Sequence, residues 1–160
     1  MYDSVRSLLE LVQEAVSPWH TVQAVRKRLS KADFQPLKLG EKWQLESGKS
    51  YYVEAFGSTV LAFTIGCNGY TEANNLRIAA SHTDFPGLRI KPHASVIKDG
   101  YGVLNIESYG GLILASWQDR PLSIAGKITL KGQDAFHPQV RLVDFAKPLL
   151  TIPELAIHMN

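Results

Sequence analysis

Hydrophobic positions change their spacing along the chain near residue 50. Before that point, apolar residues recur at the interval of an amphipathic helix, first over Leu8–Val16 and again over Val22–Ala32. The first helix is predicted to end at Ser17-Pro18, because a residue that precedes proline is pushed out of the helical region. Short β-rich runs separated by turn residues then follow, at Tyr51–Ala55, Thr59–Ile65, Leu76–Ser81, Leu88–Ile90 and Leu122–Lys131. The pattern predicts two helices followed mostly by strands.

Glycine is frequent in the second half of the chain, and no amphipathic helix of ordinary length is evident there. Those features favour a β-rich unit that is distinct from the first half, with a boundary near residues 92–100. We therefore predict one domain over residues 1–92 and a second over residues 93–160.

Composition and charge narrow the classes of function. Of the 160 residues, 45% are hydrophobic and 20% are charged, which is typical of a chain that buries a core. The 17 Lys and Arg residues exceed the 15 Asp and Glu residues by only two, which is too small an excess for a nucleic-acid partner. Cys67 is the one cysteine, and no apolar run is long enough to span a bilayer. We expect a cytoplasmic protein that binds neither nucleic acid nor membrane.

The richest chemistry lies in the segment around His82 and Asp84. Residues two apart on an extended chain face the same side, so both side chains can serve one site at the end of the predicted strand Leu76–Ser81. A metal-ligating histidine is usually oriented by a carboxylate, which makes His82 a candidate ligand and Asp84 its support. The alternative is a structural histidine beside an Asx turn, and spacing alone favours that alternative.

Further metal ligands are not evident in the sequence. It contains no His-Glu-x-x-His, no paired glutamates, no Gly-x-Ser-x-Gly and no phosphate-binding loop. His20 stands near a predicted helix start, where capping or packing is the expected role, while His93 and His137 stand beside prolines and are expected to be exposed. Asp119 and Arg120 precede Pro121, and adjacent opposite charges at such a turn favour local structural pairing over a site.

Three segments taken together resemble a known family. Residues 81–92 (SHTDFPGLRIKP), 109–127 (YGGLILASWQDRPLSIAGK) and 152–160 (IPELAIHMN) are similar, in this order, to motifs of the aspartyl aminopeptidase family of zinc metallopeptidases. The resemblance implies an α/β or α+β fold. N-terminal helices and the start of the catalytic α/β sheet would be followed by a β-rich segment of an inserted dimerisation domain.

The same resemblance assigns roles to individual residues. His82 matches the family's N-terminal metal ligand, and Asp84 matches the catalytic aspartate that orients this ligand beside a pair of zinc ions. Asp119 falls in the inserted domain, away from the ligands, so its structural interpretation is retained. His158 matches a histidine that approaches a neighbouring subunit's active site and is therefore a candidate for substrate binding. A peptide substrate and a homo-oligomer are the implied partners.

The family's chains are substantially longer, and their remaining metal ligands and paired glutamates follow the position of Asn160. We therefore expect an N-terminal portion of an aminopeptidase acting on peptides, with acidic N-terminal residues among the candidates, that is inactive as a 160-residue chain alone. The alternatives are a non-catalytic assembly module or truncated gene product, and an unrelated small α+β domain.

Overall fold

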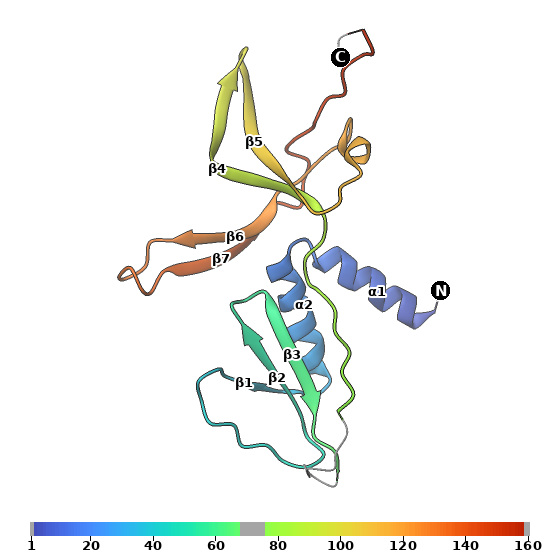
Figure 1. Ribbon diagram of the computed structural model, residues 1–160, viewed down its shortest axis with the longest axis vertical. Helices are drawn as coiled ribbons and strands as arrows, with labels where there is room; N and C mark the ends of the chain where they lie inside the picture. Colours follow the sequence, from blue (N-terminus) through green and yellow to red (C-terminus); the bar gives the residue numbers. More distant parts are fainter. Residues whose placement is uncertain (1, 68–75, 159–160) are drawn as a thin grey trace. The chain divides into compact units, whose positions relative to one another are not determined.

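The computed structural model describes residues 2–67 and 76–158, and these form two compact units (Figure 1). Unit 1 contains the described residues of Met1–Thr83 together with Ala125–Phe145. Unit 2 contains Asp84–Ile124 and the described residues of the segment from Ala146 onward. The fold is a mixture of helices and small sheets, which confirms the predicted α/β or α+β class. The predicted division into residues 1–92 and 93–160 stays a prediction.

Two helices open unit 1, as the sequence predicts. Helix α1 spans Asp3–Glu14 and helix α2 spans Pro18–Lys31. Ser17 is the N-cap of α2, where its hydroxyl accepts a hydrogen bond from the His20 backbone N–H, and Pro18 occupies the first helical position. Glu14 pairs with Arg28 at 3.2 Å, which ties the end of α1 to α2.

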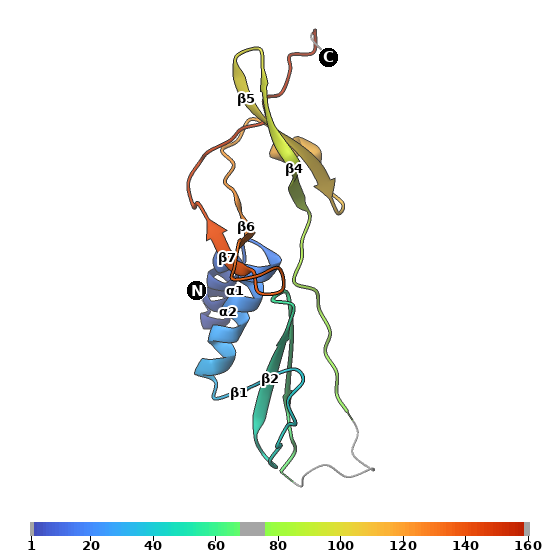
Figure 2. The same cartoon turned by 90° about the vertical axis from the view of Figure 1, so that its left-hand side faces the viewer.

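A three-stranded sheet forms the core of unit 1. Strand β2 (Ser50–Ala55) is central, with β1 (Gln35–Leu37) parallel to it on one side and β3 (Thr59–Thr64) antiparallel on the other. Neighbouring side chains of β2 point to opposite faces, and the successive residues Tyr51, Tyr52 and Val53 are all buried. The Tyr52 hydroxyl shares a hydrogen bond with Ser30 of α2, which lies along one face (Figure 2), while Tyr51 packs against Phe63.

The remaining strands of unit 1 form the hairpin of β6 (Ala125–Leu130) and β7 (Gln139–Asp144). The sequence predicts a single strand over Leu122–Lys131, and this is only partly correct. Leu122 instead makes an isolated bridge with Leu150 inside unit 2, and the strand proper begins at Ala125. Within the apolar run Leu122–Lys131, the first residue thus pairs with Leu150 and the strand from Ala125 onward pairs with β7.

Unit 2 is built around a long antiparallel hairpin. Strand β4 (Gly87–Lys98) pairs with β5 (Tyr101–Tyr109), and the turn between them has positive φ at both Asp99 and Gly100, as a tight two-residue hairpin requires. The register shifts between Ile90 and Ser95, where a bulge interrupts the pairing. A 3₁₀ helix over Leu114–Trp117 is the only helix among the described residues of this unit.

One predicted strand is absent from the described residues. Residues 76–82 have no strand structure and are exposed, so the strand expected over Leu76–Ser81 is wrong. None of the three sheets formed by the described residues pairs with this segment, and an extended chain is assigned as a strand only when a neighbour supplies hydrogen bonds.

No helix in the described ranges is long and apolar enough to cross a membrane.

Candidate functional site

His82 is the last residue but one of the N-terminal segment of unit 1. Its side chain is exposed, and it directly follows the segment 76–81. The next residue, Thr83, donates a hydrogen bond from its hydroxyl to the Ser58 carbonyl at 2.9 Å. Because Ser58 belongs to the turn between β2 and β3, this bond anchors the backbone beside His82 to the sheet. The imidazole thus extends from a fixed point of an otherwise irregular segment.

Asp84 is held by a tyrosine from the last residue of the unit 2 hairpin. The Tyr109 hydroxyl donates a hydrogen bond to Asp84 Oδ2 at 2.6 Å, and both side chains are half-buried. Tyr109 is the last residue of β5 and pairs with Gly87, the first residue of β4. The antiparallel register therefore brings Tyr109 close to Asp84, although 25 positions separate them.

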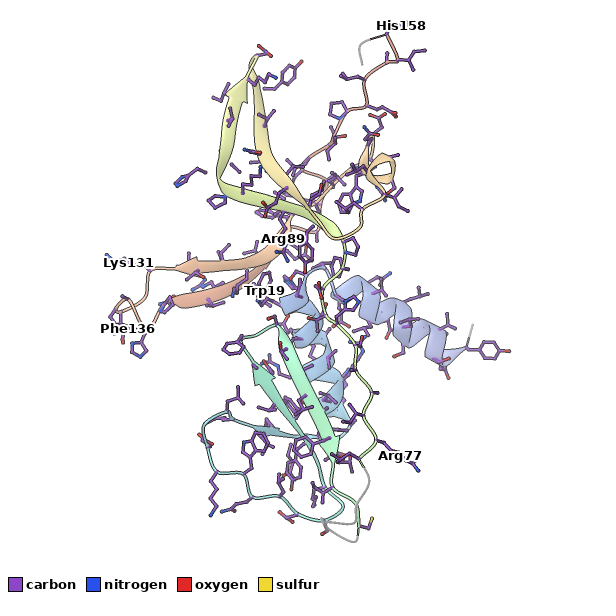
Figure 3. All side chains as sticks on the ribbon, viewed as in Figure 1. Trp19, Arg77, Arg89, Lys131, Phe136 and His158 are labelled. Carbon is purple, nitrogen blue, oxygen red and sulfur yellow. The ribbon has the colours of Figure 1, made fainter. Side chains whose placement is uncertain are left out.

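Arg89 completes this cluster from β4. Its guanidinium carbon lies 3.4 Å from the centre of the Tyr109 ring, so the planar cation stacks on the aromatic face (Figure 3 labels Arg89). The pKa of Tyr109 is raised, chiefly because its hydroxyl donates to the Asp84 carboxylate and because the negative charge of that carboxylate disfavours a phenolate. The tyrosine therefore remains a hydrogen-bond donor throughout the neutral pH range.

Gly110 allows the chain to turn away directly after Tyr109. Its φ is +74°, in the left-handed region that favours glycine, and a Cβ placed there would lie 3.3 Å from the Cα of Pro86. Pro86 stands between Asp84 and the start of β4. The chain therefore passes close to Pro86 at Gly110, beside the Asp84–Tyr109 hydrogen bond, and leaves no room there for a larger residue.

The other histidines do not gather around a metal site in the described ranges. His20 is hydrogen-bonded to Ser17 at 2.7 Å, which confirms the expected structural role at the start of α2. His93 and His137 are exposed as predicted, but His93 lies in the bulge of β4 and not in a loop. Within residues 2–67 and 76–158, no three histidine, cysteine or acidic side chains are arranged to hold a metal ion.

Asp119 has the structural role that the sequence favours, although its bonds reach the C-terminal segment and are not the local pairing expected with Arg120. Its backbone N–H donates to the Ile152 carbonyl at 2.9 Å, and its carboxylate accepts from the Glu154 N–H at 3.1 Å. Arg120 donates to the Ser116 carbonyl at 3.0 Å. The two bonds of Asp119 attach the C-terminal segment to the turn of the second motif, whereas the Arg120 bond lies within that motif.

His158 is exposed close to the end of the described chain, as Figure 3 shows. Its predicted contact with substrate stays a prediction. Residues 159–160 of the third motif lie outside the described residues.

Sequence reasoning did not identify Tyr109 or Arg89 as site residues. Both stand inside the segments that carry the family resemblance, Arg89 in residues 81–92 and Tyr109 at the start of residues 109–127. Only the β4–β5 register shows that they meet, and the β-rich runs in the sequence did not reveal β5. An aromatic residue directly before Gly110-Gly111 was the one available signal.

Comparison with known proteins identifies a family over nearly the whole chain. Residues 11–160 match the model of the family described as aminopeptidase I zinc metalloprotease, M18. A probable M18 family aminopeptidase 2 of Clostridium novyi is 43% identical over 154 residues, which are 96% of this chain and 35% of that protein. The relative with the same name from Clostridium acetobutylicum is 39% identical over 156 residues, covering 97% of this chain and 36% of its own length. The chain spans only about a third of these curated relatives.

Solved structures show the same fold. The structure of Chaetomium thermophilum mApe1 superposes with a TM-score of 0.83 at 30% identity, covering 96% of this chain and 35% of that chain. The mApe1 dodecamer of S. cerevisiae gives a TM-score of 0.80 at 26% identity, over 98% of this chain and 36% of that chain.

We expect Gly110→Ala to destabilise unit 2, whereas Gly111→Ala should have little effect. Position 110 combines positive φ with the close approach of Pro86, whereas a Cβ at position 111 would meet nothing within 4 Å. The expected cost at position 110 is about 1–2 kcal/mol, against less than about 0.5 kcal/mol at position 111. Urea unfolding followed by the near-UV signal of tyrosine and tryptophan measures both, and equal stabilities would contradict the assigned role of the Gly110 turn.

Proposed function

Because the chain belongs to the M18 family of zinc metalloproteases, we propose that it forms the N-terminal portion of an aminopeptidase that removes N-terminal residues from peptides. The observation that carries this proposal is the match of residues 11–160 to one family model, together with relatives named as M18 aminopeptidases. The three ordered motifs point to the same family. Acidic N-terminal residues are among the proposed substrates, because those motifs resemble the aspartyl aminopeptidases.

We assign His82 as one zinc ligand and Asp84 as the carboxylate that orients it. A neutral imidazole is a common zinc ligand, and an exposed side chain beside an anchored backbone is accessible to a metal. Zinc in a peptidase polarises the scissile carbonyl and lowers the pKa of bound water. The other ligands of the proposed two-metal site would come from elsewhere in the complete enzyme, since the described residues supply no group of three.

The proposed enzyme is a homo-oligomer located in the cytoplasm. The S. cerevisiae relative is a dodecamer. The family resemblance implies that His158 would reach substrate in a neighbouring subunit. The single cysteine supports a reducing compartment.

Replacing His82 tests the ligand assignment in the complete enzyme that carries this segment. We expect His82→Ala to remove one metal ion and to lower kcat by at least about 100-fold, because a zinc ion that loses a direct protein ligand is held weakly. His137→Ala, which removes another exposed imidazole far along the chain, is the matched control and should retain both metal and activity. Metal content by mass spectrometry and peptide hydrolysis are the readouts. Full zinc occupancy and turnover in His82→Ala would remove His82 from the site.

The 160-residue polypeptide by itself is expected to be inactive. One imidazole cannot hold a catalytic zinc tightly, and no general base is assigned among these residues. The measurement is hydrolysis of peptides with N-terminal aspartate or glutamate, with bound zinc determined in parallel. Turnover by zinc-loaded polypeptide would contradict this expectation.

A non-catalytic assembly module is the alternative function. In the described part of the chain, the hairpins β4–β5 and β6–β7 are two-stranded sheets, whose outer edges have no paired neighbour. If the polypeptide neither binds zinc nor contributes to hydrolysis in any complete chain, but still associates, this alternative is favoured.

A further inference from the structure

The hydrogen bond between Tyr109 and Asp84 suggests a role that the sequence alone does not assign. We propose that Tyr109 is a positioning residue of the aminopeptidase site, whose hydroxyl orients the Asp84 carboxylate so that Asp84 supports the metal ligand. This inference rests on the proposed function of His82 and Asp84. The ligand class concerned is a divalent zinc ion.

The geometry of the hydrogen bond is that of a strong contact. A separation of 2.6 Å between the Tyr109 hydroxyl and Asp84 Oδ2 falls in the short range of hydrogen bonds to an ionised carboxylate. An ionised carboxylate has about four lone-pair positions, so it can accept this bond at Oδ2 together with other hydrogen bonds. One donor at a defined oxygen restricts the rotation of the whole carboxylate.

Tyr109 is well placed to orient another group because it belongs to a regular element. Its backbone pairs with Gly87, and the following residue, Gly110, contacts Pro86. Asp84 itself precedes β4 and belongs to no strand or helix. A strand residue thus fixes a side chain on irregular backbone, which is how precise sites are usually supported.

Arg89 restrains the tyrosine in turn. Its guanidinium stacks 3.4 Å from the Tyr109 ring centre and extends from β4, the partner strand. Stacking covers one face of the ring, which limits the ring's movement, and the positive charge favours an ionised carboxylate nearby. Arg89 therefore restrains the Tyr109 ring, and the Tyr109 hydroxyl in turn orients the Asp84 carboxylate.

A purely structural hydrogen bond would affect stability but not the metal. The distinguishing readout is zinc affinity per folded molecule, measured by competition with a chelator on the complete enzyme. In Tyr109→Phe we expect affinity and kcat each to fall about tenfold, with KM within about twofold, because a group that supports a ligand acts on metal and chemistry more than on substrate binding. Tyr101→Phe removes a hydroxyl from the exposed start of the same strand and should leave all three values unchanged.

A double-mutant cycle tests whether Tyr109 acts through Asp84. In an Asp84→Ala background, Tyr109→Phe should change zinc affinity by less than about twofold, because the carboxylate it orients is gone. A tenfold loss in both backgrounds, or a Tyr109→Phe enzyme that matches Tyr101→Phe, would overturn the proposal.

A third variant covers the case in which Tyr109→Phe fails to fold. Arg89→Gln changes an exposed residue, keeps the Tyr109 hydroxyl and removes the stacked cation. It should weaken zinc affinity about threefold, and unchanged affinity would overturn the proposal. A different result would contradict the proposed function itself. In that case the His82→Ala enzyme would retain its zinc and its turnover.

Discussion

The hydrogen bond from Tyr109 to Asp84 is the interaction on which the candidate site depends. Asp84 has no regular secondary structure of its own, and a side chain from the last residue of a strand holds its carboxylate. The β4–β5 register supplies that neighbour, and Gly110 allows the chain to turn away against Pro86 without a clash. The hairpin thus serves as a support for one acidic residue.

Local signals predicted the helices and the central strands well. Ser17-Pro18 was predicted to separate the two helices, and it does so as the N-cap and first residue of α2, whereas α1 already ends at Glu14. Strands β2 and β3 lie within one residue of their predicted bounds, because their apolar runs are closed by the turn at Phe56-Gly57-Ser58. The family resemblance also rested on contiguous residues and is confirmed over residues 11–160.

Features that depend on distant partners could not be predicted. Residues 76–81 have a strand-like composition, yet among the described residues no strand pairs with them. Strands β5 and β7 were not among the predicted β-rich runs, and they pair with β4 and β6 through hydrogen bonds that local sequence does not specify. The hydrogen bond between Tyr109 and Asp84 depends on the same register, so only part of the candidate site could be predicted from the sequence. His82 and Asp84 could be named from their motif, whereas the residue that holds Asp84 could not.

A zinc-bound structure of the complete enzyme, with the metal located by anomalous scattering, tests the central claim most directly. The account predicts a ring nitrogen of His82 at about 2.0–2.1 Å from a zinc ion. It also predicts that the Tyr109 hydroxyl remains on the carboxylate of Asp84 in that structure. A zinc site complete without His82, or an Asp84 carboxylate turned away from Tyr109 beside a bound metal, would contradict it.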